Sequence, residues 1–260
     1  MTYDTVTLAM TDDRVATVTL NRPDRMNALS PQLFDDATAA IEQAVAGGAG
    51  AVVLTGAGGA FCAGADLTAA ADPSKVGDTL ERYYNPFTRL IFDLPVPVVT
   101  AINGPAVGAG LGIALLGDIS IAARSSYLLL AFVGIGLVPD AGSSWLVAKA
   151  VGRAKALELA LLGDRVSAEA AAEMGLVTRV VDDADCLPTA QALAARLARG
   201  PSPAVRLIRR QMNAALNLDL DAVLAMEAQH QGEAGRSADF MEGVTAFLQK
   251  RPPAFGGQHG

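Results

Sequence analysis

The sequence is poor in the residues that form disulfides or bind metals. Its 260 residues include only two cysteines and two histidines. Cys62 and Cys186 lie far apart and match no zinc or redox spacing, so we expect neither a disulfide framework nor a zinc site. His259 falls in the C-terminal tail, and His230 is expected to be a surface or helix-capping residue. Catalysis by histidine is therefore disfavoured.

Long apolar runs and an excess of positive charge are also missing. No segment approaches about 18 uninterrupted apolar residues, and the N-terminus lacks the layout of a signal peptide. We expect a soluble, cytoplasmic protein with no membrane segment. The 20 basic and 27 acidic residues give a net charge of −7, which repels nucleic acid and anionic membranes. An anionic ligand would need a local basic patch.

The hydrophobic content, 51%, is enough for one folded domain, with room for an appended subdomain. The first 20 residues predict two strands of a hairpin, because apolar residues alternate with threonines in "RVATVTL". Ser30 as a cap and Pro31 at the first helical position predict a helix that runs to about residue 46. The apolar run "AVVLTG" then predicts a strand covered on both faces.

Helices and strands continue to alternate along the chain. We expect a helix around residues 76–92, the strand "VPVVTAI", a glycine-rich loop with its helix, and the strand "DISIAA". This alternation is typical of an α/β fold. Beyond residue 140 the chain is mostly helical, and Ser202 with Pro203 marks a further helix start. The tail "RPPAFGGQHG" should be disordered unless a partner holds it.

The glycine-rich loop "VGAGLGIALL", residues 107–116, has three possible purposes. It could bind a phosphate, allow close helix packing or aim backbone N–H groups at a reacting oxygen. Gly108, Gly110 and Gly112 lack the spacing of a dinucleotide-binding loop, and no Gly-Lys-Ser/Thr occurs for a nucleotide phosphate. Close packing and presentation of donors therefore remain.

A second glycine-containing turn, "GAGGAFCAGADL", covers residues 56–67 and also follows a buried strand. A helix start leaves several N–H groups without partners, so two such turns lying near each other could form an oxyanion hole. The natural donors are the N–H groups of Ala65 and Ala109.

Among the carboxylates, Asp140 in "GIGLVPDAG" stands after an apolar run and at the start of an expected helix. It could simply complement the helix dipole. Alternatively, partial desolvation by its apolar neighbours would raise its pKa towards a value useful for proton transfer. These neighbours are Phe132, Val133, Ile135, Leu137 and Val138.

Other polar side chains are better explained by structural roles. Ser143 and Ser144 are not in the G-x-S-x-G turn of a serine hydrolase. Cys62 has no basic neighbour to lower its pKa, so we expect it to pack in the interior. Asp66 and Asp118 are expected to cap or stabilise local turns.

Together these stretches resemble the enoyl-CoA hydratase/isomerase (crotonase) superfamily. The resemblance is carried by "NRPDRMNALS", "AVVLTGAGGAFCAGADL", "AINGPAVGAGLGIALLGDISIAA", "GIGLVPDAGSSWLVAKAVGRAKALELALLGDRVSAEAAAEMGLVTRVV" and "GRSADFMEGVTAFLQKRPPAF". It runs in register from about residue 5 to residue 255. It implies an α/β spiral of ββα units over residues 1–200. Residues 201–260 would be a helical region and tail that mediate trimers, commonly paired into hexamers.

The resemblance also implies roles for individual residues. The N–H groups of Ala65 and Ala109 would bind the oxygen of an acyl-CoA thioester. Substrate and CoA contacts would come from Arg25, from Ala63, Asp66 and Leu67 in the "CAGADL" turn, from Phe132, and from Phe247 and Lys250 of a neighbouring subunit.

The sequence departs from the family's hydratases at both glutamates that activate water. Gly112 occupies the first position and Phe132 the second, so nothing there can take or give the proton of water. Asp140 instead matches the acid in the P-D-x-G turn of 1,2-epoxyphenylacetyl-CoA isomerases and of dienoyl-CoA isomerases. The resemblance to the former is closer.

We therefore expect an acyl-CoA isomerase in which one aspartate serves as base and then as acid, with no metal or redox cofactor. The reaction would be a double-bond shift or the ring expansion of an aryl epoxide. Two alternatives stay open: weak hydration of 2-enoyl-CoA, and a catalytically silent acyl-CoA-binding subunit in which Asp140 is only a helix cap.

Overall fold

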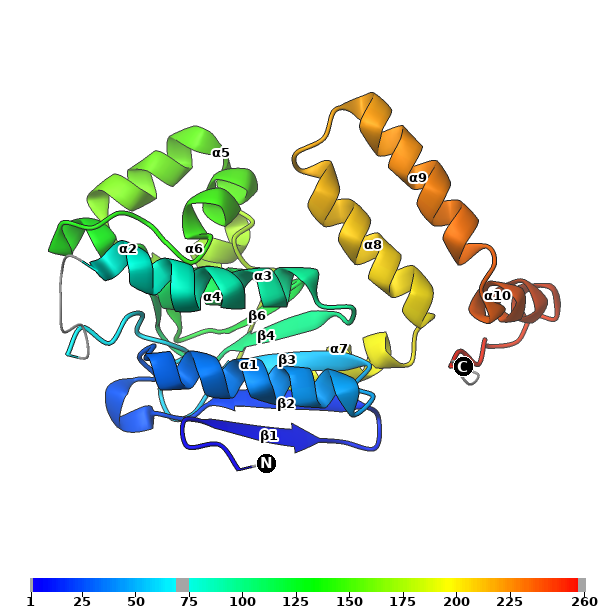
Figure 1. The fold of residues 1–260 in the computed structure, drawn as a ribbon, viewed down its shortest axis with the longest axis horizontal. Helices are drawn as coiled ribbons and strands as arrows, with labels where there is room; N and C mark the ends of the chain where they lie inside the picture. The colour runs from blue at the N-terminus through cyan, green and yellow to red at the C-terminus, as the bar shows by residue number, and fades with distance from the viewer. Residues whose placement is uncertain (1, 69–74, 257–260) are drawn as a thin grey trace.

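The structure, a computed structural model, describes residues 2–68 and 75–256 and is built on two sheets. The larger sheet has six strands in the order β1-β2-β3-β4-β6-β9, of which Figure 1 labels β1, β2, β3, β4 and β6. Only β1 is antiparallel to its neighbour, and the other pairs are parallel. The strands are β1 (Val6–Met10), β2 (Val15–Leu20), β3 (Ala51–Gly56), β4 (Val98–Ile102), β6 (Ile119–Ala123) and β9 (Arg179–Val181).

A second, smaller sheet shows that the chain winds as a spiral. It contains β5 (Ala106–Val107), β7 (Tyr127–Leu129) and β8 (Val166–Ser167), with β7 in the middle. Single bridges extend this layer, from Cys62 to Ala106 and from Leu29 to Ala65. After each of β2, β3, β4 and β6 the chain thus crosses to the second layer. The predicted spiral α/β architecture is confirmed.

The helices begin where the sequence signals place them. Ser30 caps α1 (Pro31–Ala46), with its hydroxyl accepting from the N–H of Leu33 at 3.2 Å. The helix expected near residues 76–92 consists of α2 (Val76–Thr79), a π-helical turn (Leu80–Tyr84) and α3 (Asn85–Asp93). The remaining helices are α4 (Ala109–Leu115), α5 (Ser143–Leu162), α6 (Ala168–Glu173), α7 (Cys186–Ala198), α8 (Ser202–Ala215), α9 (Leu220–Ala234) and α10 (Ala238–Leu248).

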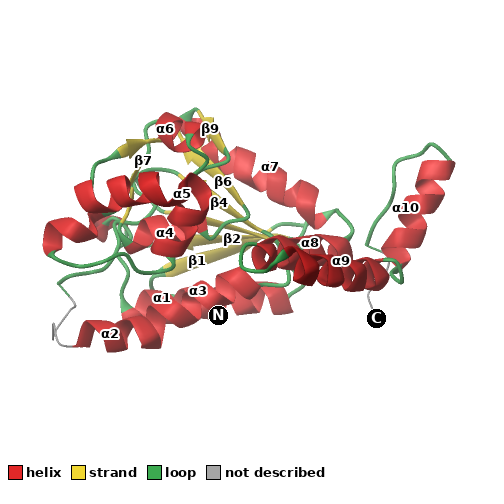
Figure 2. Cartoon of the chain, turned by 90° about the horizontal axis from the view of Figure 1, so that it is seen from above, coloured by secondary structure: helices red, strands yellow, loops and turns green. Residues whose placement is uncertain are grey.

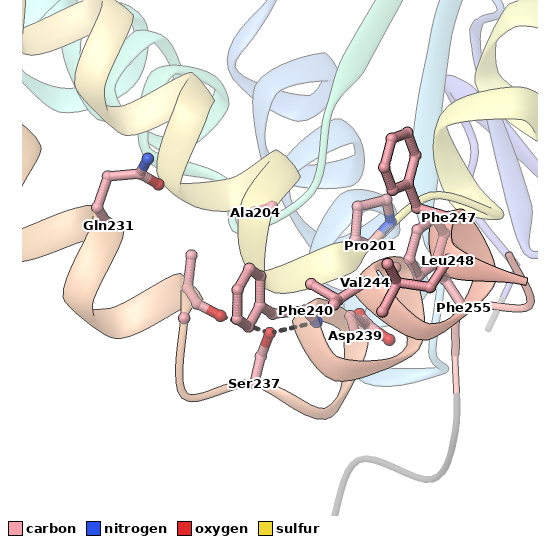
Figure 3. Close-up of a pocket in the computed structure, with 13 residues that line it drawn as sticks. Pro201, Ala204, Gln231, Ser237, Asp239, Phe240, Val244, Phe247, Leu248 and Phe255 are labelled. Carbon is pink, nitrogen blue, oxygen red and sulfur yellow. Dashed lines mark hydrogen bonds between the residues drawn. The ribbon is translucent and has the colours of Figure 1, made fainter.

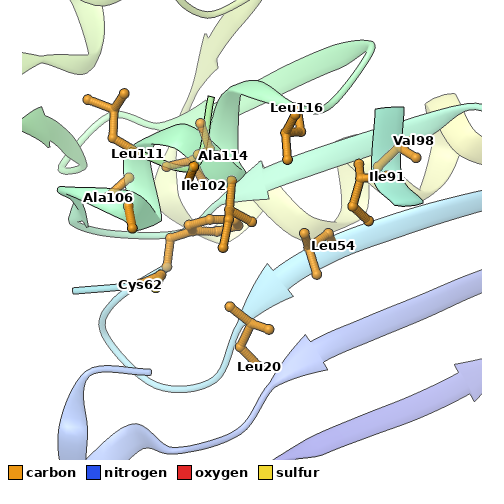
Figure 4. Packing of buried hydrophobic residues seen from close by; sticks show 14 of the residues in the cluster. Leu20, Leu54, Cys62, Ile91, Val98, Ile102, Ala106, Leu111, Ala114 and Leu116 are labelled. Atoms are coloured by element: carbon orange, nitrogen blue, oxygen red, sulfur yellow. The ribbon is translucent and has the colours of Figure 1, made fainter. Parts of the chain in front are cut away.

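Two hydrophobic cores lie on opposite faces of the larger sheet. In β3, Val52 and Leu54 belong to the core shared with α1, α3 and α4, part of which is drawn in Figure 4. Ala51 and Val53 point to the other face, where they pack against α7. This explains why "AVVLTG" is apolar throughout, as expected for a strand covered on both faces.

Helices α8, α9 and α10 extend away from the sheets, as Figures 1 and 2 both show. Arg209 of α8 ties this region to the core. Its Nε lies 2.6 Å from Oδ2 of Asp118, and its Nη2 donates to the carbonyl oxygen of Ile91 at 2.5 Å. Asp118 also accepts from the N–H of Val98 at 2.7 Å. It therefore joins distant segments, and the expectation that it stabilises a local turn is wrong.

The expectation of a disordered tail is also wrong for residues 251–256. Arg251 makes an ion pair with Glu242 of α10 at 2.7 Å, and the N–H of Ala254 donates to the same carboxylate. Residues 257–260 of the tail lie outside the described part of the chain. Within residues 2–68 and 75–256, no helix is both long and apolar enough to cross a bilayer.

Removing the Arg209 side chain should weaken the fold strongly. In Arg209→Ala, the carboxylate of Asp118, whose side chain is 24% exposed, loses its cation, and the carbonyl oxygen of Ile91 loses a buried donor. We expect a loss of about 2 kcal/mol. Urea unfolding measures the loss. The matched control is Arg199→Ala, whose pair with Asp13 is exposed and should contribute less than about 1 kcal/mol. Equal losses in the two variants would contradict the role of Arg209.

Candidate active site

The two glycine-containing turns meet at one edge of the sheets. The N–H of Val107 donates to the carbonyl oxygen of Cys62 at 2.9 Å, and the N–H of Cys62 donates to that of Pro105 at 3.1 Å. A Cβ atom at Gly110 would collide with the carbonyl oxygen of Cys62, so this close approach requires glycine. The packing interpretation of the loop is thus confirmed at Gly110.

The same approach brings two free backbone donors together. The N–H groups of Ala65 and Ala109 have no acceptor among the described residues. Ala109 is the first residue of α4, where an N–H has no partner within the helix. Gly64, with φ of +87°, belongs to the first turn and lies close to the second. A Cβ atom at Gly64 would be 3.5 Å from the nitrogen of Ala109. Both alanines line a cavity of about 150 Å³.

Asp140 lies where this small cavity meets a larger one of about 330 Å³. It follows the 3₁₀ segment Ala131–Ile135 and precedes α5. Ala65, Leu67 and Leu137 also line both cavities, so the walls around the carboxyl group are mainly apolar. If the N–H groups held one atom of a ligand in the small cavity, the rest of that ligand would extend past the carboxyl group into the larger cavity.

One oxygen atom of the Asp140 side chain is unpartnered among the described residues. Its Oδ1 is buried and has no hydrogen-bond partner within the described chain, and desolvation raises the pKa of the carboxyl group to about 6. The start of α5 is stabilised by the carbonyl oxygen of Asp140, which accepts from the N–H and the hydroxyl group of Ser143. The side chain itself makes no hydrogen bond to the start of α5, so the structure shows no capping bond from Asp140.

The turn that carries Asp140 packs against α4 at Gly112. A Cβ at Gly112 would lie 2.7 Å from the carbonyl oxygen of Ala141 and 3.1 Å from its Cβ. Ala141 and Gly142 both have positive φ, 48° and 75°, which turns the chain sharply after Asp140. A glutamate at position 112 therefore does not fit beside this turn.

Other expected substrate contacts surround the same space. Ala63, Leu67 and Phe132 line the small cavity, with Phe132 buried. Asp66 lines the larger one, but its carboxylate accepts from the hydroxyl group of Thr68 and pairs with Arg22 at 2.8 Å. These two interactions, with Thr68 the larger, hold the pKa of Asp66 below its usual value. Asp66 stabilises its turn, as expected.

Three predicted CoA contacts are not gathered at these cavities. Arg25 is exposed, and the arginine that reaches the site's turn is Arg22. Phe247, on α10, lines a separate cavity of about 590 Å³ between the C-terminal helices (Figure 3), and Lys250 is exposed just beyond that helix. Phe247 and Lys250 were expected to act from a neighbouring subunit, which a single chain does not test. Lys75, which the sequence analysis missed, lines the larger cavity.

The remaining candidates have structural roles. Cys62 is fully buried, and burial raises the pKa of its thiol to about 12, so the packing interpretation is confirmed. His230 is buried, with Nδ1 lying 3.2 Å from Oε1 of Gln211, and the expectation of a surface or capping residue is wrong. His259 lies outside the described residues. Within those residues, no group of three or more His, Cys, Asp or Glu side chains is placed to hold a metal ion.

The sequence analysis also missed the aromatic wall of the larger cavity. Phe34, Tyr83 and Tyr84 line it, together with Leu80 of the same π-helical turn. The rings of Phe34 and Tyr84 lie 4.5 Å apart. The spacing of Leu80, Tyr84 and Phe87 is an amphipathic helical signal, but this signal does not tell core residues from cavity residues.

Comparison with known proteins agrees with this geometry. The family model described as enoyl-CoA hydratase/isomerase matches residues 10–258. The chain belongs to this family. It is 45% identical to a probable enoyl-CoA hydratase of Rhodobacter capsulatus, covering 99% of this chain and 100% of that protein. It is 44% identical to the 1,2-epoxyphenylacetyl-CoA isomerase of Escherichia coli, covering 96% and 98%.

Solved structures show that the fold is that of the crotonase family. An enoyl-CoA hydratase from Bacillus anthracis matches with a TM-score of 0.92 at 33% identity, covering 98% of this chain and 100% of that one. One from Polaromonas sp. JS666 matches with a TM-score of 0.91 at 30% identity, covering 96% and 99%. The chain is thus an enzyme of the enoyl-CoA hydratase/isomerase family.

The contact between Gly112 and Ala141 can be tested by stability. Gly112→Ala forces the Asp140 turn away from α4 and should lower the free energy of unfolding by about 1–3 kcal/mol. Thermal and urea unfolding provide the measurement. Gly59→Ala is the control, because a Cβ there meets nothing within 4 Å, and it should stay within about 0.5 kcal/mol of the parent. An unchanged Gly112→Ala protein would show that the turn adapts freely.

Proposed function

We propose that this family member is an acyl-CoA isomerase that uses Asp140 as its single acid and base. The observation that carries the proposal is the unpartnered, desolvated carboxyl group of Asp140 beside two free N–H groups. A pKa of about 6 leaves this group mostly ionised near neutral pH yet able to return a proton. Gly112 and Phe132, where the family's hydratases carry glutamates, offer no second proton carrier.

In the proposed reaction, the thioester oxygen accepts hydrogen bonds from the N–H groups of Ala65 and Ala109. This lowers the energy of the enolate, and each donor is typically worth about 10²- to 10³-fold in rate. Asp140 removes a proton alpha or gamma to the carbonyl carbon, and the C–H electrons enter a dienolate. The neutral Asp140 then returns the same proton to the other carbon. The double bond moves, and no atom is gained or lost.

The acyl group would occupy the larger cavity. Its volume of about 330 Å³ and its walls of Phe34, Tyr83 and Tyr84 suit a ring or a medium-length chain. The relative named 1,2-epoxyphenylacetyl-CoA isomerase supports an aryl acyl group, and with it ring expansion of an aryl epoxide as the second isomerisation. The proposal needs no metal or redox cofactor, because one carboxylate moves one proton.

We also propose that CoA is bound across subunits of a trimer or hexamer. Helices α8 to α10 and the turn between α8 and α9 expose many large apolar side chains in the single chain, which favours burial against further copies. These are Ile208, Met212, Leu216, Leu218, Leu220, Leu224, Phe240, Met241, Val244, Phe247 and Leu248. Arg25 of one subunit, with Phe247 and Lys250 of its neighbour, would then supply the contacts that the isolated site lacks.

Asp140→Asn should abolish isomerisation while leaving acyl-CoA binding intact. The amide cannot accept a proton, and such groups contribute about 10²- to 10⁴-fold. Stopped-flow absorbance measures the conversion of 3-enoyl- to 2-enoyl-CoA. In the parent enzyme, kcat/KM should rise as the pH increases through about 6, because the carboxyl group must be ionised to act as a base.

Asp164→Asn, which changes an exposed aspartate, is the control and should keep the rate and pH profile of the parent. Full turnover by Asp140→Asn would refute the assignment of the base. Tight acyl-CoA binding by the parent, no turnover of any enoyl substrate, and recovery only with a second chain would instead support a catalytically silent binding subunit.

A second candidate activity, hydration, is favoured by the relative named a probable enoyl-CoA hydratase. We expect hydration of crotonyl-CoA to be slower than isomerisation by about 10²-fold or more, because neither Gly112 nor Phe132 can activate water. Loss of absorbance of the conjugated thioester measures water addition. Hydration as fast as isomerisation would show that another group activates water and would make hydratase the better assignment.

A further inference from the structure

The hydroxyl group of Tyr84 is a polar group of the larger cavity to which the proposed proton transfer gives no role. Tyr84 is only 6% exposed and lines this cavity together with Ala65 and Asp140. Its ring is held 4.5 Å from that of Phe34, and it ends the π-helical turn Leu80–Tyr84. Such turns occur often at functional sites.

The hydroxyl group of Tyr84 is an unused hydrogen-bond donor. It has no hydrogen-bond partner among the described residues, and Tyr84 lines the cavity. The other hydroxyl groups of the cavity differ. That of Ser30 caps α1, that of Thr79 donates to the carbonyl oxygen of Lys75, and Tyr83 is half-buried, within reach of solvent. Tyr84 is therefore the donor that a bound acyl group would cover.

The position of Tyr84 is next to the proposed base. Burial and the nearby carboxylate of Asp140 raise the pKa of Tyr84, which keeps the phenol protonated. Thr88 lies one helical turn beyond Tyr84, and a Cβ at Gly142 would lie 3.4 Å from its Cγ2. This face of the helix thus packs beside the turn that carries Asp140. Tyr84 and Asp140 thus line one cavity, and an acyl group that filled it would contact both.

We propose that Tyr84 forms a donor subsite for an oxygen atom carried by the acyl group, so that the enzyme selects oxygenated acyl-CoA thioesters over hydrocarbon ones. An acyl group without such an oxygen would cover the hydroxyl group and leave it unpaired, which costs binding energy. The inference rests on the proposed function only in placing the acyl group of a CoA thioester in this cavity. It does not depend on which residue is the base.

The test compares two ring-bearing probes of similar shape, 2-methoxyphenylacetyl-CoA and 2-ethylphenylacetyl-CoA. The first offers an ether oxygen as an acceptor, and the second does not. Titration calorimetry on the full chain should show the methoxy probe binding about fivefold more tightly, the value expected of one neutral hydrogen bond. Tyr84→Phe should remove this preference. Tyr127→Phe, which removes a phenol from β7 outside both cavities, should keep it.

The outcomes separate the two proposals. Equal binding of the probes by the parent would overturn the donor subsite, and so would a preference that survives in Tyr84→Phe. Either result would do so whether or not Asp140→Asn keeps its isomerase activity. A preference lost only in Tyr84→Phe would support it even if Asp140→Asn stayed active. Failure of the parent to bind either thioester would contradict both proposals.

Discussion

The site depends on the close backbone contact between the turns that follow β3 and β4. The hydrogen bond from Val107 to Cys62 and the missing Cβ at Gly110 bring the two chain segments together. The two turns follow strands of the sheet, which fix the course of their backbone. The N–H groups of Ala65 and Ala109 are therefore oriented before any ligand binds. Such preorganised donors stabilise developing negative charge without the cost of reorientation.

A glycine also determines the position of Asp140. Gly112 allows the turn of Asp140 to lie against α4, and the backbone carbonyl of Asp140, bonded to Ser143, anchors that turn. The carboxyl group is thereby left in apolar surroundings with an unpartnered oxygen, and desolvation raises its pKa. A side chain at position 112 would instead meet the carbonyl oxygen and the Cβ of Ala141, so the glycine is part of what keeps this turn in place.

Local signals in the sequence were sufficient for most of the elements. The cap at Ser30, the apolar strand "AVVLTG" and the two glycine-containing turns all predicted what the structure contains. Two of the errors concern contacts between distant segments. Asp118 binds Arg209 of α8, and His230 is buried beside Gln211. Neither partner is near in sequence, so no local pattern could have indicated it.

The sequence by itself determined the family, the spiral order of strands and helices, and the residue types available for proton transfer. Only the tertiary structure decided which polar atoms have no hydrogen-bond partner. It joined the Ala65 and Ala109 donors, left the side chain of Asp140 unpaired instead of capping α5, and placed Tyr84 in the cavity wall. The physical reason is that burial and hydrogen bonding depend on neighbours brought from far along the chain, and these decide whether a polar group stabilises the fold or remains available for a ligand.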